Sequence, residues 1–336
     1  MAQRPTIRTV AERAGVSKSL VSLVLRGSPH VSETKRSAVL TAIRELHYRP
    51  DAAARALTES RSRVVGVLVH DLHNPWYLDA LDGIASVLSQ AGLQMLLAVQ
   101  RLDLVNGETF LPAMLEMKAA GIVLVGSLEH TDQVVEAVAE VPTVAVANRD
   151  PGLVDVDVVA GDDEAGTRLA VHHLVALGHD HVACLAVGTT GVGRLRRDAF
   201  VAAAVSEGIA VAPVVDATEA DEDGAYRAAV RLLTAPDRPT AVVCYNDLVA
   251  LGALSAARDL GLRVPEDVSL VGYDNTQVAQ LRSIGLTTVD NSSFRLGSRA
   301  ATLLVERVDA PWRAAAFELV EPTLVVRSST APAPGA

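Results

Sequence analysis

Residues 16–27 read VSKSLVSLVLRG and predict a short amphipathic helix near the start of the chain. If Ser17 caps a helix that begins at Lys18, the apolar residues gather on one face: Leu20, Val21, Val24 and Leu25. The opposite face carries small hydroxyls and positive charges, with Leu23 at its edge: Lys18, Ser19, Ser22 and Arg26. One face can therefore pack in a core while the other offers hydrogen-bonding groups.

A second predicted helix lies directly upstream. Thr6 can cap residues 7–13, and a tight turn follows this helix. Ala11, Gly15 and Val21 stand at the spacing A-x3-G-x5-V, which gives two crossing helices a small contact residue, a left-handed turn and an apolar closure. This spacing is typical of a helix-turn-helix, whose second helix enters the major groove of DNA.

A third helix is predicted over residues 33–46, after Ser32, and completes a small all-α unit. Such a unit can also be a plain three-helix core with no role in nucleic-acid binding. Charge favours the DNA-binding interpretation. Residues 1–63 hold 12 Lys or Arg and 5 Asp or Glu, whereas the rest of the chain holds 18 and 35. A basic head on an acidic body is typical of a DNA-binding module joined to a domain with another task.

Length and composition set the outer limits. A chain of 336 residues that is 49% hydrophobic can bury a large core and predicts two or three domains. We find no apolar run before a cleavage site and no stretch of 18 apolar residues, and we therefore expect a cytoplasmic protein with no membrane partner. Cys184 and Cys244 lie in aliphatic runs and are expected to be buried thiols, not a disulfide.

From Val64 onward, short aliphatic runs alternate with helical stretches. The predicted strands form two sets of four: 64–69, 93–99, 121–126 and 143–147, then 181–187, 211–215, 240–245 and 268–273. Continuous aliphatic strands between amphipathic helices indicate parallel sheets covered on both faces. The prediction is an α/β core of two doubly wound parallel-sheet subdomains, with a ligand cleft at the carboxyl ends of the strands.

Polar and aromatic residues near those strand ends are the candidates for binding a small effector. They are Asn74, Trp76, Tyr77, Gln100, Ser127, Arg149, Asp162, Arg196, Asn246, Asp247 and Asp274. Carboxylates and amides beside an aromatic ring suit a hydroxyl-rich molecule. Each residue alone can also be a turn or a helix cap, and Asn246 is a good N-cap for a helix over 247–260.

Other chemistry is not indicated. The run GTTGVG at 188–193 lacks the Gly-Lys-Ser/Thr ending of a phosphate-binding loop. The histidines 172, 173, 179 and 181 have no accompanying thiol. We therefore predict no metal, no cofactor and no enzymatic activity.

The sequence resembles the LacI/GalR family of transcriptional regulators over nearly its whole length. Residues 6–57, TIRTVAERAGVSKSLVSLVLRGSPHVSETKRSAVLTAIRELHYRPDAAARAL, resemble that family's headpiece and hinge. Blocks of the body match in order: HHLVALGHDHVACLAVG, RPTAVVCYNDLVALGALSAARDLGLRVPEDVSLVGYDNT, LTTV and EPTLVVRSST. The resemblance implies a periplasmic-binding-protein-like core, a homodimer, a palindromic double-stranded DNA operator and an effector in the interdomain cleft.

The resemblance also implies roles for single residues. Lys18, Ser19 and Leu23 occupy base-reading positions, and phosphate contacts fall on Thr6, Ser17, Ser22 and Ser32. A hinge helix carries Leu57 into the minor groove, and Arg26 and Arg55 complete the DNA-binding set. In the pocket, effector contacts fall on Arg196, Asn246 and Asp274. Leu23 departs from the arginine of many members, and since leucine cannot bond guanine, we expect an operator half-site other than the commonest one.

The expected function is a sequence-specific regulator, most simply a repressor. The alternative is a solute-binding protein with the same core and no DNA role. The expected domains are a headpiece (1–49), a hinge helix and linker (50–62), a core (63–330) and a disordered tail (331–336). Within the core, we expect one subdomain over about 63–160 and 292–320 and the other over about 161–291 and 321–330.

Overall fold

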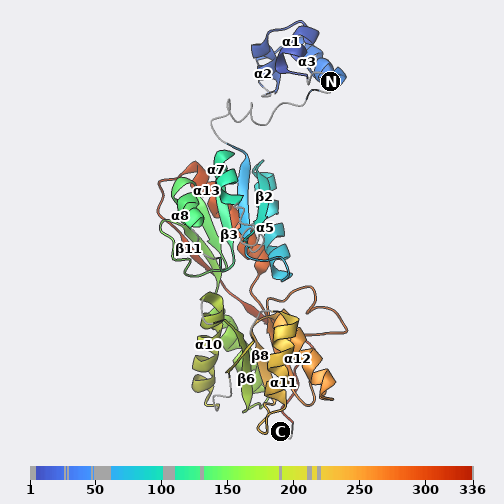
Figure 1. Cartoon of the computed structure of the whole chain (residues 1–336), viewed down its shortest axis with the longest axis vertical. Helices are drawn as coiled ribbons and strands as arrows, with labels where there is room; N and C mark the ends of the chain where they lie inside the picture. The colour runs from blue at the N-terminus through green and yellow to red at the C-terminus, as the bar shows by residue number, and fades with distance from the viewer. Residues whose placement is uncertain are drawn as a thin grey trace. The chain divides into compact units, whose positions relative to one another are not determined.

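The computed structural model describes residues 5–25, 28, 30–46, 48, 62–100, 110–128, 132–188, 191–209, 214–217 and 221–334. The chain forms two compact units, Met1–Ser62 and Arg63–Ala336, which are described separately (Figure 1). Arg26, Arg55, Leu57 and the predicted hinge before Ser62 lie outside the described residues.

The first unit contains the three predicted helices, α1 (Ile7–Ala14), α2 (Lys18–Leu25) and α3 (Glu33–Glu45). Thr6 forms a capping box with Thr9 at the start of α1, and Gly15 ends that helix in the left-handed conformation, with φ 66°. Ser32 precedes α3 as predicted, but its side chain makes no capping hydrogen bond. The three helices bury one small core: Val10, Ala11, Val21, Val24, Val31, Val39 and Ala42.

The second unit contains two sheets. In the first, all pairings are parallel and the order is β11-β5-β4-β3-β1-β2. Its strands are β1 (Val64–Val69), β2 (Gln94–Val99), β3 (Gly121–Val125), β4 (Thr143–Val146), β5 (Asp157–Gly161) and β11 (Phe317–Val320). The second sheet has the order β12-β10-β9-β8-β6-β7, with only β12 antiparallel. Its strands are β6 (Val182–Val187), β7 (Val214–Ala217), β8 (Ala241–Cys244), β9 (Ser269–Tyr273), β10 (Thr287–Asp290) and β12 (Thr323–Val325).

Helices cover both faces of each sheet, as the aliphatic strands require. On the first sheet, one face packs against α5 (Trp76–Gln90) and α13 (Ser293–Asp309), and the other packs against α7 (Phe110–Glu116) and α8 (Asp132–Glu140). The second sheet lies between two further pairs: α11 (Glu222–Leu233) and α12 (Asp247–Asp259), and α9 (Asp163–Ala176) and α10 (Gly191–Glu207). The predicted pair of doubly wound sheets is therefore confirmed.

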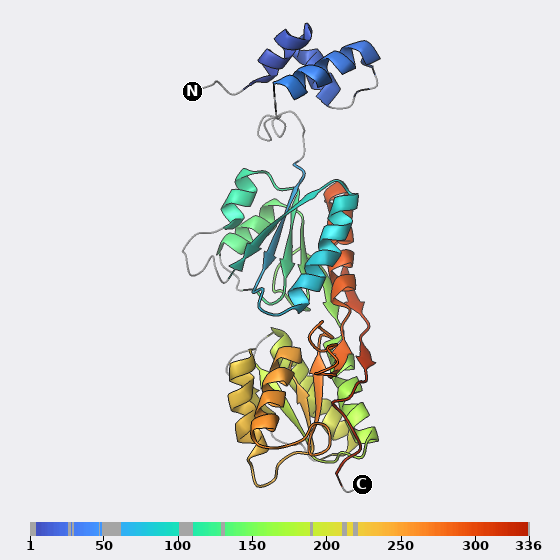
Figure 2. The ribbon, with the colours of Figure 1, turned by 90° about the vertical axis from the view of Figure 1, so that its right-hand side faces the viewer.

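The predicted number of strands was wrong, because each sheet has six strands in the described residues and not four. The missed strands are three to five residues long, and each contains at least one polar residue: β5, β10, β11 and β12. They also carry the chain between the sheets. The chain crosses from one sheet to the other after β5, after β10 and after β11. Each lobe, by which we mean one sheet with its covering helices, is therefore built from separate stretches of sequence (Figure 2).

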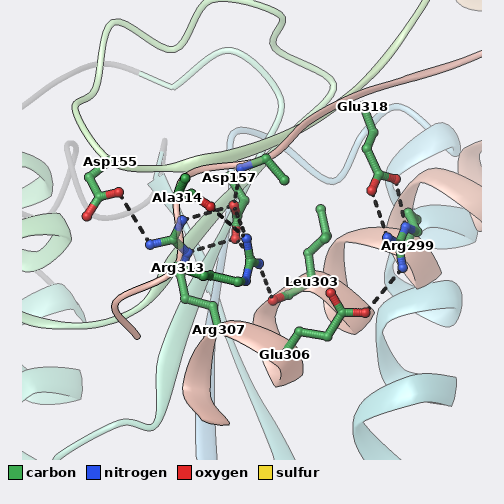
Figure 3. Close-up of polar contacts among 10 residues, drawn as sticks. Asp155, Asp157, Arg299, Leu303, Glu306, Arg307, Arg313, Ala314 and Glu318 are labelled. Carbon is green, nitrogen blue, oxygen red and sulfur yellow. Dashed lines mark hydrogen bonds and ion pairs between the residues drawn. The ribbon is translucent and has the colours of Figure 1, made fainter. Parts of the chain in front are cut away.

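A buried ionic network holds α13 and residues 313–316 against the first sheet (Figure 3). The Asp157 carboxylate is fully buried at the start of β5. It accepts hydrogen bonds from Arg307 Nε at 2.8 Å, Arg313 Nη1 at 2.9 Å and the backbone N–H of Ala316 at 2.6 Å. One carboxylate thus joins β5, α13 and the entry to β11.

The two cysteines are free and buried, as predicted. They lie on the neighbouring strands β6 and β8 but belong to cores on opposite faces of the sheet. Burial raises the pKa of Cys184 to about 12 and holds the pKa of Cys244 well above its ordinary range. Both thiols are therefore unreactive.

The end of the chain is more ordered than predicted. Residues 331–334 were expected in a disordered tail, yet Ala331 N donates to Ser269 Oγ at 3.1 Å and Ala333 N donates to Leu177 O at 2.9 Å. His179, whose Nε2 lies 3.0 Å from Ala331 O, completes this attachment. No helix within the described ranges is long and apolar enough to span a bilayer.

Candidate functional site

A cavity of about 900 Å³ lies between the two sheets of the second unit. It opens where the carboxyl ends of the strands from both lobes meet, the usual ligand position in open parallel sheets. Its polar and aromatic lining comes from both lobes: His70, Asp71, His73, Asn74, Trp76, Tyr77, Ser127, Asp163, Arg196, Asp221, Tyr245, Asn246, Asp274 and Asn291.

Seven of the eleven predicted effector-binding residues line this cavity: Asn74, Trp76, Tyr77, Ser127, Arg196, Asn246 and Asp274. The other four lie elsewhere. Gln100 is buried, and Arg149 pairs with Glu164 at 3.1 Å. Asp162 caps α9 by accepting a hydrogen bond from the Ala165 N–H at 3.0 Å, which leaves the next residue to face the cavity.

Asp247, the fourth of these residues, is not among the lining residues and instead bonds the segments next to the cavity. Its carboxylate accepts hydrogen bonds from Thr276 N at 2.7 Å, Thr276 Oγ1 at 2.8 Å and Thr288 Oγ1 at 2.6 Å. Burial raises its pKa to about 6, although these three donors oppose the shift. Asp247 therefore holds the turn that follows β9 and does not face the cavity.

Arg196, on α10, is one of the residues that line the cavity. Its Nε donates to Asp163 Oδ1 at 2.7 Å and its Nη1 donates to the backbone carbonyl of Tyr245 at 2.7 Å. Its guanidinium lies over the Tyr273 ring, 3.5 Å from the centroid, and its Nη2 is 3.6 Å from Asp274 Oδ1. Asp163 and Asp274 thus share one cation.

Asp274 lies at the base of the cavity in an unusual backbone conformation. Its φ is 104°, a region that side chains other than glycine rarely adopt and that clusters at functional sites. Its Oδ1 accepts from Asn291 Nδ2 at 3.0 Å and its Oδ2 accepts from Asn74 Nδ2 at 3.3 Å. Burial raises the pKa of Asp274 to about 7, although the attraction of Arg196 opposes the shift.

Two aromatic residues begin α5 beside the cavity. Trp76 is only 5% exposed, and its Nε1 donates to Asn291 Oδ1 at 2.9 Å. Tyr77 lies edge-on to Trp76, with ring centroids 5.2 Å apart, and is half-buried. A Cβ added to Gly126 would lie 2.5 Å from the Tyr77 hydroxyl, so this glycine makes room for the ring. Both residues line the cavity, and Tyr77 is the less buried of the two.

Sequence reasoning missed several lining residues, above all Asp163, Tyr245 and Asn291. Tyr245 follows β8 directly and precedes a residue that was predicted, so its position at a strand end was an available signal. Asn246 both lines the cavity and caps α12, because its Oδ1 accepts from Val249 N at 2.9 Å. The capping interpretation of Asn246 is therefore confirmed.

The outer face of α2 presents the predicted base-reading residues of the first unit. Lys18, Ser19 and Leu23 are exposed, whereas Val21 and Val24 are buried against the other helices. Ser17 caps this helix, since its Oγ accepts from Leu20 N at 3.3 Å. An exposed helix face with a lysine and small hydroxyls suits the major groove.

Comparisons with known proteins find a matching family for each of the two units. Residues 6–51 match the family described as bacterial regulatory proteins of the lacI family, and residues 171–330 match the periplasmic binding protein-like domain. The chain is 32% identical to the HTH-type transcriptional repressor PurR of Pasteurella multocida, over 96% of this chain and 98% of that protein.

Solved structures give the same result. A lac repressor dimer bound to operator and the anti-inducer ONPF is 28% identical, with a TM-score of 0.86 over 98% of this chain and 100% of that one. A complex of the transcriptional regulator CelR with cellobiose is 30% identical, with a TM-score of 0.71 over 97% of this chain and 100% of that one.

Proposed function

The chain belongs to the LacI family of bacterial regulatory proteins and is a transcriptional repressor, not an enzyme; from this premise we propose how its residues act. The first unit binds a palindromic operator as part of a homodimer in the cytoplasm. A small molecule in the cavity of the second unit changes the affinity for that operator. Residues from both lobes converge on one cavity and touch across it through Asn74 and Asp274, and this observation carries the proposal.

A ligand in this cavity favours one orientation of the two lobes over another. A ligand can shift an equilibrium only by its difference in affinity for the two states. Because Asn74 belongs to one lobe and Asp274 to the other, a molecule that bonds to both meets this condition. The neighbour solved with cellobiose supports a sugar or a similar polar metabolite as the effector.

The proposed DNA contacts divide into two groups. Lys18, Ser19 and Leu23 read base edges, and Leu23 contacts a thymine methyl group. The remaining proposed residues contact the phosphates or the minor groove: Thr6, Ser17, Ser22, Arg26, Ser32, Arg55 and Leu57.

A mobility-shift experiment with selected genomic fragments tests the function. The full-length protein should shift a palindromic fragment, and the complex should weaken steeply as salt rises, because phosphate contacts release counterions. Lys18→Gln should weaken the complex at all salt concentrations, whereas Lys118→Gln, an exposed lysine of the second unit, should not. If no fragment is shifted at low salt, the result would favour the alternative, a solute-binding protein with no DNA role.

A further inference from the structure

We propose that the effector is an uncharged or cationic molecule rich in hydrogen-bond donors, and that the cavity excludes anions such as phosphate esters. This inference rests on the proposed function, because it names the chemical class that the effector site accepts.

The charges around the cavity are mostly negative. Four carboxylates line it: Asp71, Asp163, Asp221 and Asp274. Among the described residues, Arg196 is the single arginine or lysine of the lining. His73 lies 2.7 Å from Asp71. When ionised, these four carboxylates outnumber the one guanidinium. A phosphate group would therefore enter a site of its own sign.

The single arginine is already engaged by groups of the chain itself. Arg196 already bonds the Asp163 carboxylate and the Tyr245 carbonyl, and one face of its guanidinium is covered by Tyr273. Its side chain is only 11% exposed. A bidentate grip on a phosphate or a carboxylate needs two free N–H groups on one edge. Asp163 already takes Nε on one edge, and on the other edge Nη2 lies 3.6 Å from Asp274 Oδ1, so an anion bound there would face a second carboxylate.

The carboxylates, in contrast, are ready to accept. Asp274 receives only neutral amide donors, from Asn74 and Asn291, and shares Arg196 with Asp163. When Asp274 is ionised, two buried carboxylates and one guanidinium leave an excess negative charge beside Arg196. Hydroxyl or ammonium donors of a ligand stabilise that charge, and an anion adds to it.

Helix dipoles bear on this conclusion at two helices beside the cavity, α10 and α13, whose first turns hold no acidic residue. Asp162 caps α9 and Asp221 caps α11, so these amino ends already meet a carboxylate of the chain. The α10 helix begins at Gly191 with no acidic residue in its first turn. If the proposal is wrong, an anion is expected at this amino end.

Ser127 gives a position from which the charge preference can be measured. It is exposed, lines the cavity and lies opposite α10, where a Cβ on Gly191 would come within 3.0 Å of its hydroxyl. The Ser127→Cys variant of the full chain would be treated with a trimethylammonium and a sulfonate methanethiosulfonate of equal chain length. Native Cys184 and Cys244 are buried and give no background reaction.

The rate ratio of the cationic to the anionic reagent should be at least about tenfold higher in Ser127→Cys than in Ser89→Cys, an exposed position on α5. Adding Asp221→Asn should lower the ratio, and so should salt. A ratio equal to or below that of the Ser89→Cys control would overturn the proposal and point to the amino end of α10. The reaction does not involve DNA, so its outcome is independent of operator binding.

Discussion

Asn74 Nδ2 donates a hydrogen bond of 3.3 Å to Asp274 Oδ2 and joins the two lobes at the base of the cavity. Asn74 follows β1 and Asp274 follows β9, so the contact spans 200 residues of sequence. The Asn74 Oδ1 accepts from Trp76 N at 3.0 Å, and Trp76 in turn bonds Asn291, which bonds Asp274. A closed ring of hydrogen bonds therefore links the lobes where an effector is proposed to enter.

The Asp274→Asn variant should lose its effector response while keeping its operator affinity. A hydrogen bond to a charged group contributes about 1.5–3 kcal/mol, so its loss lowers effector affinity more than about tenfold. A reporter assay over a range of effector concentrations measures this. Arg149→Ala, which removes a side chain outside the cavity, should respond as the wild type does. A normal response of Asp274→Asn would remove Asp274 from the site.

The same variant should change how stability depends on pH. Because burial raises the pKa of Asp274 from 3.8 to about 7, its stabilising contribution is complete below the lower value and is lost as pH rises through the higher one. The melting temperature of Asp274→Asn relative to wild type should therefore rise between about pH 5 and about pH 8. Each kcal/mol corresponds to about 2–4 °C in a domain of this size. A difference that does not vary with pH would contradict the raised pKa.

The ionic network of Figure 3 contains a matched pair of test positions. Asp157→Asn leaves Arg307 and Arg313 without a buried counter-charge, and this should cost about 3–5 kcal/mol of unfolding free energy. Glu318→Gln weakens a partly exposed pair with Arg299 and should cost about 1 kcal/mol or less. Urea unfolding of the two variants measures both changes. Equal losses would show that the buried network has no special weight.

His179 should make the protein sensitive to mild acid. Burial lowers its pKa, and its ring contacts Thr240, Ser269 and Ala331. The lowered pKa means that stability falls as pH drops below the ordinary histidine value of about 6.5, because the unfolded chain then binds a proton that the folded chain does not. The melting temperature should fall between about pH 7.5 and about pH 5.5, and less steeply in His179→Gln. An unchanged slope in His179→Gln would contradict the lowered pKa of His179.

The helices of the first unit were predictable because local signals act there. Thr6, Gly15 and Ser17 define helix ends through contacts within a few residues, and the structure has those contacts. The strands β5, β10, β11 and β12 were missed because they are only three to five residues long and each contains at least one polar residue. No local pattern shows that a polar stretch such as TTVD will be buried by another strand.

The site was predictable only as far as strand ends reveal it. Asp162 and Asp163 both follow β5, and the start of α9 decides which of them faces the cavity. The stacking of Arg196 on Tyr273 joins residues on two different elements, and sequence spacing carries no trace of it. Lists of strand-end residues therefore locate a site, and packing decides its members.

The three crossings between the lobes bear on how the protein is made. The first sheet needs β11 and its α5 face needs α13, both of which are translated after the whole second sheet except β12. During synthesis, the apolar side of α5 around Ile84 and Leu88 must wait for Leu296, Leu303 and Leu304 to leave the ribosome. The helices of the first unit, complete by Glu45, can form much earlier. A nascent chain can thus carry a finished DNA-reading head before it has any means of sensing an effector, and a late nonsense codon would release such a chain.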